Sequence, residues 1–229
     1  MTLNSARGPT AAVLRNVLAA IVCGTLMQCI FDARGEAVRI CCVGDSITRG
    51  DSPAGTRPAS YPDELQEFLG EAYEVCNLGS PGTCVLKDAY GPYWETDEFA
   101  RVFELEPKVI VVMFGTNDSK PYNWSSDSAF LRDYQDLVDT LRASAVRAPR
   151  IFLCTPPPAF SRAYDVSPDT LHNHIVPNIQ QLAASRHVSL VDCYTLLETE
   201  PENFPDGIHP DEKGAMLIGA IVHRALEEK

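Results

Sequence analysis

The sequence predicts one three-layer α/β sandwich over residues 36–229, with a five-stranded parallel sheet between two layers of helices. Three observations support this prediction. Short apolar runs rich in β-branched residues alternate along the chain with longer segments of helical periodicity. Most of these runs end at glycine or proline, where buried strands commonly stop. Alternating strands and helices imply right-handed crossovers, which place helices on both faces of a parallel sheet.

Five apolar runs account for the strands. The first run ends at Gly44, the second ends at Gly79, and the fourth is followed by the prolines at 156–158. The third run is the most hydrophobic of the five and consists largely of valine and isoleucine, so we expect a central strand buried on both faces. The predicted strands are residues 38–43, 73–78, 109–114, 151–154 and 188–193.

Four longer segments place apolar residues on one helical face. In the first of them, Leu65, Phe68 and Leu69 are spaced in this way, and Gly70 follows as a natural C-cap. In the last one, Leu217 and Ile221 continue the same pattern. The predicted helices are residues 61–69 and approximately 128–146, 168–185 and 211–226.

The first 35 residues differ in composition from the rest of the chain. Residues 1–31 contain no acidic residue, and Arg7 and Arg15 precede an apolar run. A basic start, a short apolar stretch and then small residues form the layout of a secretory signal peptide. We therefore expect residues 1–35 to be a signal peptide and the protein to be secreted or in the secretory-pathway lumen. A mitochondrial presequence and a cytoplasmic protein with an extra packed helix are the alternatives.

The chain is acidic, with 19 Lys and Arg against 31 Asp and Glu and a net charge of −12. Such a protein repels phosphate backbones, so nucleic acid is not an expected partner. The apolar run at residues 17–31 is shorter than the roughly 20 residues of a transmembrane helix, so no stable membrane span is expected. Loss of residues 1–35 would change the net charge from −12 to −14.

Cysteine and histidine usage does not indicate a metal site. Most cysteines after residue 35 lie in predicted strands, where cysteine usually serves as a small buried hydrophobe. No Cys-x-x-Cys pair and no zinc-type Cys/His spacing occurs, and His172 and His174 would not share a helix face. We therefore expect no metal and no cofactor. A disulfide, for example one that involves Cys84, is left open.

Polar segments follow the first three predicted strands. They are residues 44–48, 79–82 and 115–118, and a fourth segment at 206–210 precedes the last helix. In a doubly wound sheet, sites lie outside the carboxyl ends of the strands. We therefore expect the four segments to meet at one edge of the sheet.

These segments supply a candidate hydrolytic site. The hydroxyl of Ser46 is a poor nucleophile until a base removes its proton, and His209 is the best placed base. Asp206 can accept a hydrogen bond from the imidazole, fix its tautomer and stabilise the imidazolium. The backbone N–H groups of Ser46 and Gly79 and the side chain of Asn117 are the natural donors of an oxyanion hole. We expect the neighbouring aspartates at 45 and 118 to brace the loops by accepting hydrogen bonds.

The four segments together resemble blocks I, II, III and V of the SGNH (GDSL) hydrolase superfamily. They occur in the order and spacing of that family, and the match covers nearly everything after residue 38. The resemblance implies a flavodoxin-like α/β/α fold and hydrolysis of carboxylic esters. It also implies that Ser46 is the nucleophile, that His209 is the base and that Asp206 orients it. Ser46, Gly79 and Asn117 would form the oxyanion hole.

A narrower resemblance concerns the substrate. Residues 87, 91–94, 115–121, 123–124 and 154–160 look like the branch often labelled sialate O-acetylesterase or carbohydrate acetylesterase. This resemblance implies removal of O-acetyl groups from carbohydrates, with a small-molecule or glycan ester as the partner. The alternatives are a lipase or thioesterase that acts on lipid or acyl esters, and a carbohydrate-binding module without catalysis.

Aromatic and cationic residues in the loops are candidates for substrate contacts. Tyr93, Trp94 and Trp124 could stack on a sugar ring. Arg49 and Lys120 could hold an anionic group such as a carboxylate. Because an acidic surface does not attract an anion, a neutral acetylated sugar fits the net charge more easily than a sialate.

Overall fold

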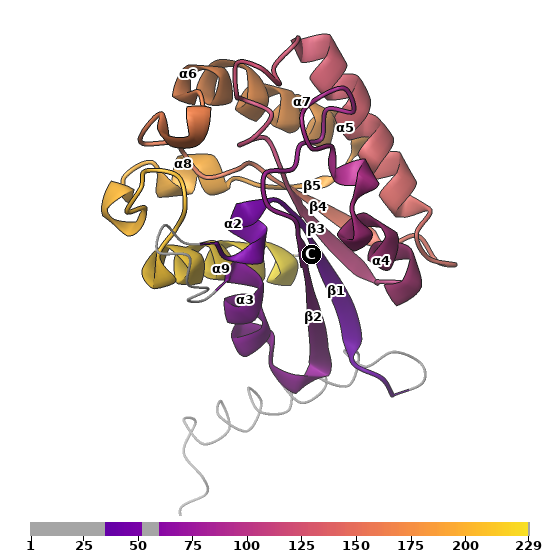
Figure 1. Ribbon diagram of the computed structural model, residues 1–229. Coiled ribbons are helices and arrows are strands. Elements are labelled where there is room, and N and C mark those ends of the chain that lie inside the picture. Colours follow the sequence, from indigo (N-terminus) through magenta and orange to yellow (C-terminus); the bar gives the residue numbers. More distant parts are fainter. Residues whose placement is uncertain (1–34, 52–59, 229) are drawn as a thin grey trace, which may run out of the picture.

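The computed structural model describes residues 35–51 and 60–228 (Figure 1). The expected signal peptide at residues 1–35 lies, apart from Gly35, outside the described residues. Within the described ranges, no helix combines the length and apolar character that a membrane crossing requires. All six cysteines in these ranges are free thiols.

Five parallel strands form one sheet in the order β2-β1-β3-β4-β5, the order of flavodoxin-like folds. The five predicted strands are therefore confirmed. The last one is shorter than the predicted 188–193, because Asp192 leaves the sheet and its side chain accepts a hydrogen bond from the Thr195 N–H at the start of a helix. The strands are β1 (Val38–Gly44), β2 (Tyr73–Gly79), β3 (Val109–Met113), β4 (Arg150–Cys154) and β5 (Ser189–Val191).

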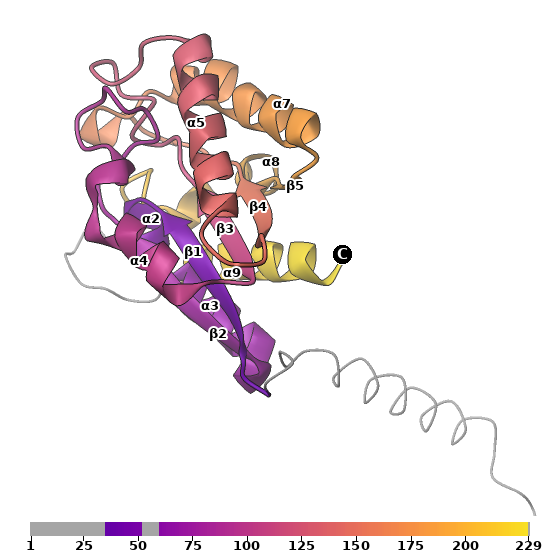
Figure 2. The same ribbon diagram turned by 90° about the vertical axis from the view of Figure 1, so that its right-hand side faces the viewer.

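Helices cover both faces of the sheet, so the predicted three-layer architecture is confirmed (Figures 1 and 2). One face packs against α4 (Asp97–Leu105), α5 (Asp127–Arg142) and α7 (Val176–Arg186). The other face packs against α3 (Tyr61–Leu69) and α9 (Glu212–Glu227). The short helices are α2 (Ser46–Arg49), α6 (Pro168–Thr170) and α8 (Cys193–Leu197).

Alternate residues of each strand supply the two cores. In β3, Ile110 and Val112 face α4, α5 and α7, whereas Val109 and Val111 face α3 and α9. All four side chains are buried. A strand buried on both faces must be apolar at every position, which explains the continuous run that predicted it.

Helix α4 was not predicted from the sequence. Its N-cap is Thr96, whose side chain accepts a hydrogen bond from the Phe99 N–H, and Val102 is its one fully buried residue. Phe99 and Leu105 lie on the same face as Val102 and pack against the core, so the apolar stripe is present in the sequence and was overlooked.

The predicted helix at residues 168–185 is divided in two. Between α6 and α7 the chain forms a π-helical turn at Leu171–Ile175, directly before Pro177. Proline lacks the N–H that would continue the α-helical hydrogen bonds, and a π turn accommodates such an interruption without ending the helix. Leu171 and Ile175 are both buried against the sheet.

Candidate active site

A hydrogen-bonded chain of three side chains lies at the carboxyl edge of the sheet. Ser46 Oγ is 2.9 Å from His209 Nε2, and His209 Nδ1 is 2.8 Å from Asp206 Oδ2. Ser46 follows β1, whereas the other two residues lie in the loop before α9. The fold therefore joins residues 163 positions apart in sequence. Such a chain can move the serine proton onto the imidazole, which makes the serine oxygen nucleophilic.

Asp206 is held in its ionised form. Its Oδ1 accepts hydrogen bonds from the backbone N–H groups of Ile208 and His209, at 2.8 and 2.7 Å. Burial alone would raise the pKa of Asp206, but the hydrogen bonds from His209 and Ile208 outweigh burial, and the pKa is lowered. An ionised carboxylate favours a proton on His209 Nδ1, which leaves Nε2 free to accept the proton of Ser46.

A tight turn presents Ser46. Asp45 caps α2 because its Oδ1 accepts the Ile47 N–H at 2.9 Å, and the Gly50 N–H closes the turn on the Ser46 carbonyl. Asp45 is 1% exposed and Ser46 is 8% exposed. The hydroxyl of Ser46 therefore extends from backbone that is fixed on both sides.

Gly79 is required by the packing of this turn. A Cβ atom at position 79 would lie 2.2 Å from the Arg49 nitrogen and 2.8 Å from the Asp45 carbonyl oxygen. The Gly79 N–H, a predicted oxyanion donor, donates to Asn77 Oδ1 at 3.0 Å. To bind an oxyanion, this N–H must exchange or share that acceptor. The absence of a side chain at position 79 is therefore needed for the close approach of the α2 backbone, and not only for the approach of a substrate.

Asn117 lies in the loop after β3 and is buried. Its Nδ2 donates to the Thr83 carbonyl at 3.1 Å and to Asp45 Oδ2 at 3.4 Å. Its own carbonyl accepts hydrogen bonds from Asn123 Nδ2 at 2.9 Å and from the Lys120 N–H at 3.3 Å. The Asp45 contact places the Asn117 amide beside the turn that carries Ser46. An oxyanion would compete with two internal acceptors for its N–H groups.

Asp118 braces a neighbouring loop from a fully buried position. Its Oδ1 accepts the N–H groups of Val85 and Leu86, both at 2.9 Å, while Oδ2 is buried without a hydrogen-bond partner. Burial raises the pKa of Asp118 to about 7, and the nearby Asp45 contributes in the same direction. Burial likewise raises the pKa of Asp45 to about 6.

These raised pKa values predict that the protein becomes less stable as the pH rises from about 4 to 7. The folded state keeps protons on Asp118 and Asp45 that the unfolded chain releases near pH 4, so this stabilisation is complete below pH 4 and is lost as the pH passes the folded pKa values. Asp118→Asn should remove the Asp118 contribution, which is up to about 4 kcal/mol. Thermal unfolding from pH 5 to 8 tests this, with exposed Asp97→Asn as the control. An unchanged pH dependence in the Asp118 variant would contradict it.

The structure corrects the predicted role of Tyr93. Its side chain is fully buried, its hydroxyl donates to the Leu78 carbonyl at 2.8 Å, and its ring packs on Phe114 at a centroid distance of 4.9 Å. The prediction that Tyr93 contacts a substrate is therefore wrong, because that side chain belongs to the core. The neighbouring Trp94 is partly buried, and its indole N–H donates to the Val85 carbonyl at 2.9 Å. A substrate contact by Trp94 stays a prediction.

The other predicted binding residues also have partners within the protein. Arg49 is exposed, and its guanidinium binds both oxygens of Asp51, at 2.6 and 2.9 Å. Lys120 is partly exposed, and its charge partly offsets the burial that raises the pKa of Asp45. Trp124 is partly buried between Phe130 and His174. Contacts of Arg49, Lys120 and Trp124 with a substrate stay predictions.

Two residues beside the site were missed in the sequence. Ser161 Oγ donates to the Asp206 carbonyl at 2.7 Å, and the Tyr164 ring lies 5.2 Å from the His209 ring. Both residues belong to the loop after β4, and no motif or spacing marks them. Only the packing of this loop against the loop before α9 reveals them.

No metal centre is evident in the residues that the structure describes, because no three or more of their His, Cys, Asp and Glu side chains are grouped to hold an ion. His172 Nδ1 lies 3.1 Å from the Tyr194 hydroxyl, and His174 Nδ1 lies 3.1 Å from Asp127 Oδ1. The two histidines therefore have different partners.

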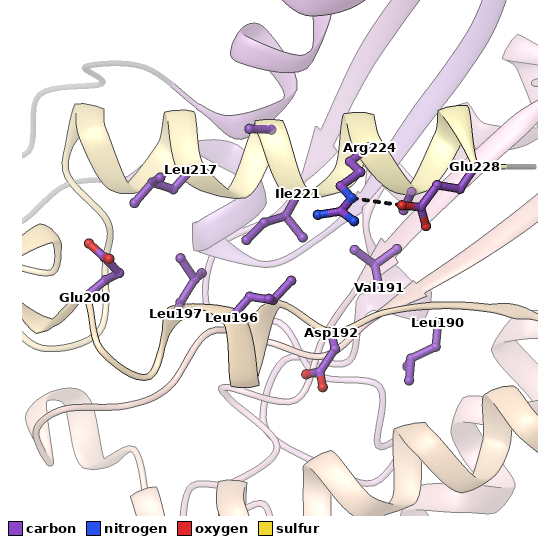
Figure 3. Close-up of a pocket in the computed structure, with 12 residues that line it drawn as sticks. Leu190, Val191, Asp192, Leu196, Leu197, Glu200, Leu217, Ile221, Arg224 and Glu228 are labelled. Carbon is purple, nitrogen blue, oxygen red and sulfur yellow. Dashed lines mark hydrogen bonds and ion pairs between the residues drawn. The ribbon is translucent and has the colours of Figure 1, made fainter.

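A groove of about 530 Å³ lies between β5, α8 and the later turns of α9 (Figure 3). Leucine and isoleucine side chains dominate it, and Arg224 and Glu228 form an ion pair at one end, with Arg224 Nε 2.8 Å from Glu228 Oε1. The residues that line it include no serine, histidine or cysteine. Neither Ser46, in α2, nor His209, in the loop before α9, lines this groove, so the groove is separate from the candidate active site.

The chain is similar in sequence to a known protein family and to a known esterase. Residues 42–217 match the GDSL-like lipase/acylhydrolase family. An acetylxylan esterase from Xylanibacter ruminicola is 30% identical over 221 residues, which cover 89% of this chain and 46% of that protein. The chain thus spans about half the length of this relative.

Solved structures of other proteins resemble most of the chain. An aryl esterase from M. smegmatis matches with a TM-score of 0.70 and 21% identity, over 84% of this chain and 99% of the other. A carbohydrate acetylesterase from Sinorhizobium meliloti matches with a TM-score of 0.69 and 17% identity, over 83% of this chain and 99% of the other. At such identities the likeness shows the fold.

Proposed function

Because this chain belongs to the GDSL-like lipase/acylhydrolase family and carries the domain of a carboxylic-ester hydrolase, we propose that it removes acetyl groups from neutral carbohydrates through Ser46. The observation that carries this proposal is the hydrogen-bonded chain from Ser46 through His209 to Asp206. Few arrangements other than nucleophilic catalysis require a serine hydroxyl, an imidazole and an ionised carboxylate in this order.

The proposed reaction has two halves. Ser46 Oγ attacks the acyl carbonyl while its proton passes to His209 Nε2, and the imidazolium is stabilised by Asp206. The tetrahedral intermediate collapses, the alcohol leaves with the proton from His209, and the acyl group stays on Ser46. Water then attacks the acyl-serine, with His209 again as the base, and releases the carboxylic acid.

The negative charge of the tetrahedral intermediate needs hydrogen-bond donors. The proposed donors are the N–H groups of Ser46 and Gly79 and the side-chain amide of Asn117. Gly79 and Asn117 donate to internal acceptors in this structure, at 3.0 Å to Asn77 and at 3.1 Å to the Thr83 carbonyl. We propose that the oxyanion, which is a stronger acceptor than a neutral amide, draws these N–H groups away from their present partners.

Two observations support a neutral acetylated sugar as the substrate. A protein named acetylxylan esterase is 30% identical to this chain. In addition, the net charge of −12 disfavours the approach of an anionic substrate such as a sialate. Of the cations near the site, Arg49 is already bound to Asp51.

Labelling and a substrate panel test the proposal. A fluorophosphonate probe should react with one serine, and peptide mass spectrometry should identify it as Ser46. The panel comprises acetylated xylan, an O-acetylated sialic acid and p-nitrophenyl esters from acetyl to dodecanoyl. We expect acetate release from acetylated xylan and at least about ten-fold preference for acetyl over octanoyl esters. Preference for long chains would indicate a lipase or thioesterase instead, and absence of labelling would indicate a module without catalysis.

A further inference from the structure

The loop after β4 is fastened to the loop that carries His209. The Phe160 N–H donates to the Gly207 carbonyl at 2.8 Å, and Ser161 Oγ donates to the Asp206 carbonyl at 2.7 Å. Gly207 has a φ of +80°, and a Cβ atom there would lie 2.6 Å from the Ser161 side chain. The two loops are therefore in direct backbone contact.

The backbone immediately after this attachment is left-handed. Tyr164 has a φ of 56° and Asp165 has a φ of 62°, although neither is glycine. A bulky residue rarely adopts this region, since its Cβ atom approaches the neighbouring carbonyl oxygen. Such strain persists only where surrounding contacts impose it, and it is concentrated at functional sites.

This conformation brings the Tyr164 ring against the imidazole of His209. The ring centroids are 5.2 Å apart and the planes cross at 74°, an edge-to-face arrangement. The negative charge of the Asp206 carboxylate raises the pKa of the Tyr164 hydroxyl. Tyr164 nevertheless remains 53% exposed. Because the side chain is largely exposed, packing in the core does not account for its left-handed backbone.

We propose that Tyr164 is a positioning residue, which holds the imidazole of His209 so that Nε2 faces Ser46 while Nδ1 stays on Asp206. This inference rests on the proposed function, in which His209 is the base. Hydrogen bonds to Asp206 and Ser46 hold the two ring nitrogens, but the bond to Ser46 is given up when Ser46 attacks, and the bond to Asp206 alone leaves the imidazole free to tilt. A ring packed against the imidazole restricts that tilt, and small displacements of a base lower the rate steeply.

The test uses two substitutions that separate the ring from the backbone. Tyr164→Gly removes the ring and relieves the left-handed strain, so we expect an unchanged or higher Tm together with about a ten-fold lower kcat and a KM within about two-fold. Tyr164→Phe keeps the ring and should retain kcat within about three-fold. Tyr90→Ala, at a tyrosine that is 83% exposed, is the control and should behave as the unaltered protein.

The rate of fluorophosphonate labelling distinguishes the possible outcomes. A positioning role predicts that Tyr164→Gly slows the labelling of Ser46 about as much as it lowers kcat, because both reactions need the base. Equal labelling and turnover in the glycine variant and the unaltered protein would overturn the inference while leaving the proposed function in place. A raised KM with unchanged labelling would also overturn it, and would indicate a substrate contact. If the unaltered protein is not labelled, the proposed function itself fails.

Discussion

Ser46→Ala should lower kcat/KM for acetyl esters by at least about 10⁴-fold and leave the fold intact. The substitution removes the only atom of the hydrogen-bonded chain that can attack a carbonyl, and His209 Nε2 then has no hydroxyl within 2.9 Å to activate. The remaining rate would come from substrate binding and from the oxyanion donors. Initial rates with p-nitrophenyl acetate, together with a thermal unfolding curve, measure both parts of this prediction.

A serine outside the hydrogen-bonded chain provides the control. Ser128 is exposed near the start of α5, and its hydroxyl lies 3.1 Å from that of Ser126. Ser128→Ala should retain full activity. Loss of activity in Ser46→Ala accompanied by a large fall in Tm would indicate misfolding. In that case, fluorophosphonate labelling of the unaltered protein shows whether Ser46 is the nucleophile. Full activity in a folded Ser46→Ala protein would refute the role of Ser46.

Asp206→Asn should have the second largest effect, a fall in kcat of about 10³- to 10⁴-fold. In the unaltered protein, Asp206 Oδ1 accepts hydrogen bonds from the backbone N–H groups of Ile208 and His209 at 2.8 and 2.7 Å, and the asparagine oxygen can still accept both. The amide nitrogen would then face His209 Nδ1 and donate to it. This places the imidazole proton on Nε2, so that the nitrogen next to Ser46 can no longer accept a proton.

The control for this substitution is Asp211→Asn. Asp211 caps α9 by accepting the Gly214 N–H at 2.9 Å, and asparagine is an equally good N-cap. It therefore tests the loss of one negative charge close to the site without a change of tautomer. An equal fall in rate in the two variants would mean that Asp206 acts only through its charge, and retained activity in Asp206→Asn would exclude the proposed orienting role.

The architecture could be predicted from the sequence because it follows from local patterns. A parallel sheet covered on both faces needs strands that are apolar at every position, and these appear as short continuous runs such as the one that forms β3. The helices with a broad apolar stripe were predicted for the same reason. Helix α4 has such a stripe as well, at Phe99, Val102 and Leu105, and was overlooked. The π-helical turn at Leu171–Ile175, which divides one predicted helix, was not indicated by the apolar periodicity.

The candidate site was predicted less evenly. Ser46, His209 and Asp206 were found because they belong to recognisable segments, and the order of these segments determines which loops share an edge of the sheet. Tyr93 was misjudged because it lies in a loop of aromatic residues, although its ring is buried against Phe114. Tyr164 was missed because nothing in its neighbourhood resembles a motif.

By itself, the sequence determined the fold class, the five strands and the four polar segments that reach one edge. These properties depend on side-chain periodicity and on the few connections that a parallel sheet allows. Only the tertiary structure decided that Tyr93 is core, that Tyr164 lies on His209, and that the Gly79 and Asn117 donors bind internal acceptors. The physical reason is that burial and hydrogen-bond partners are set by residues distant in sequence, whose approach no local pattern records.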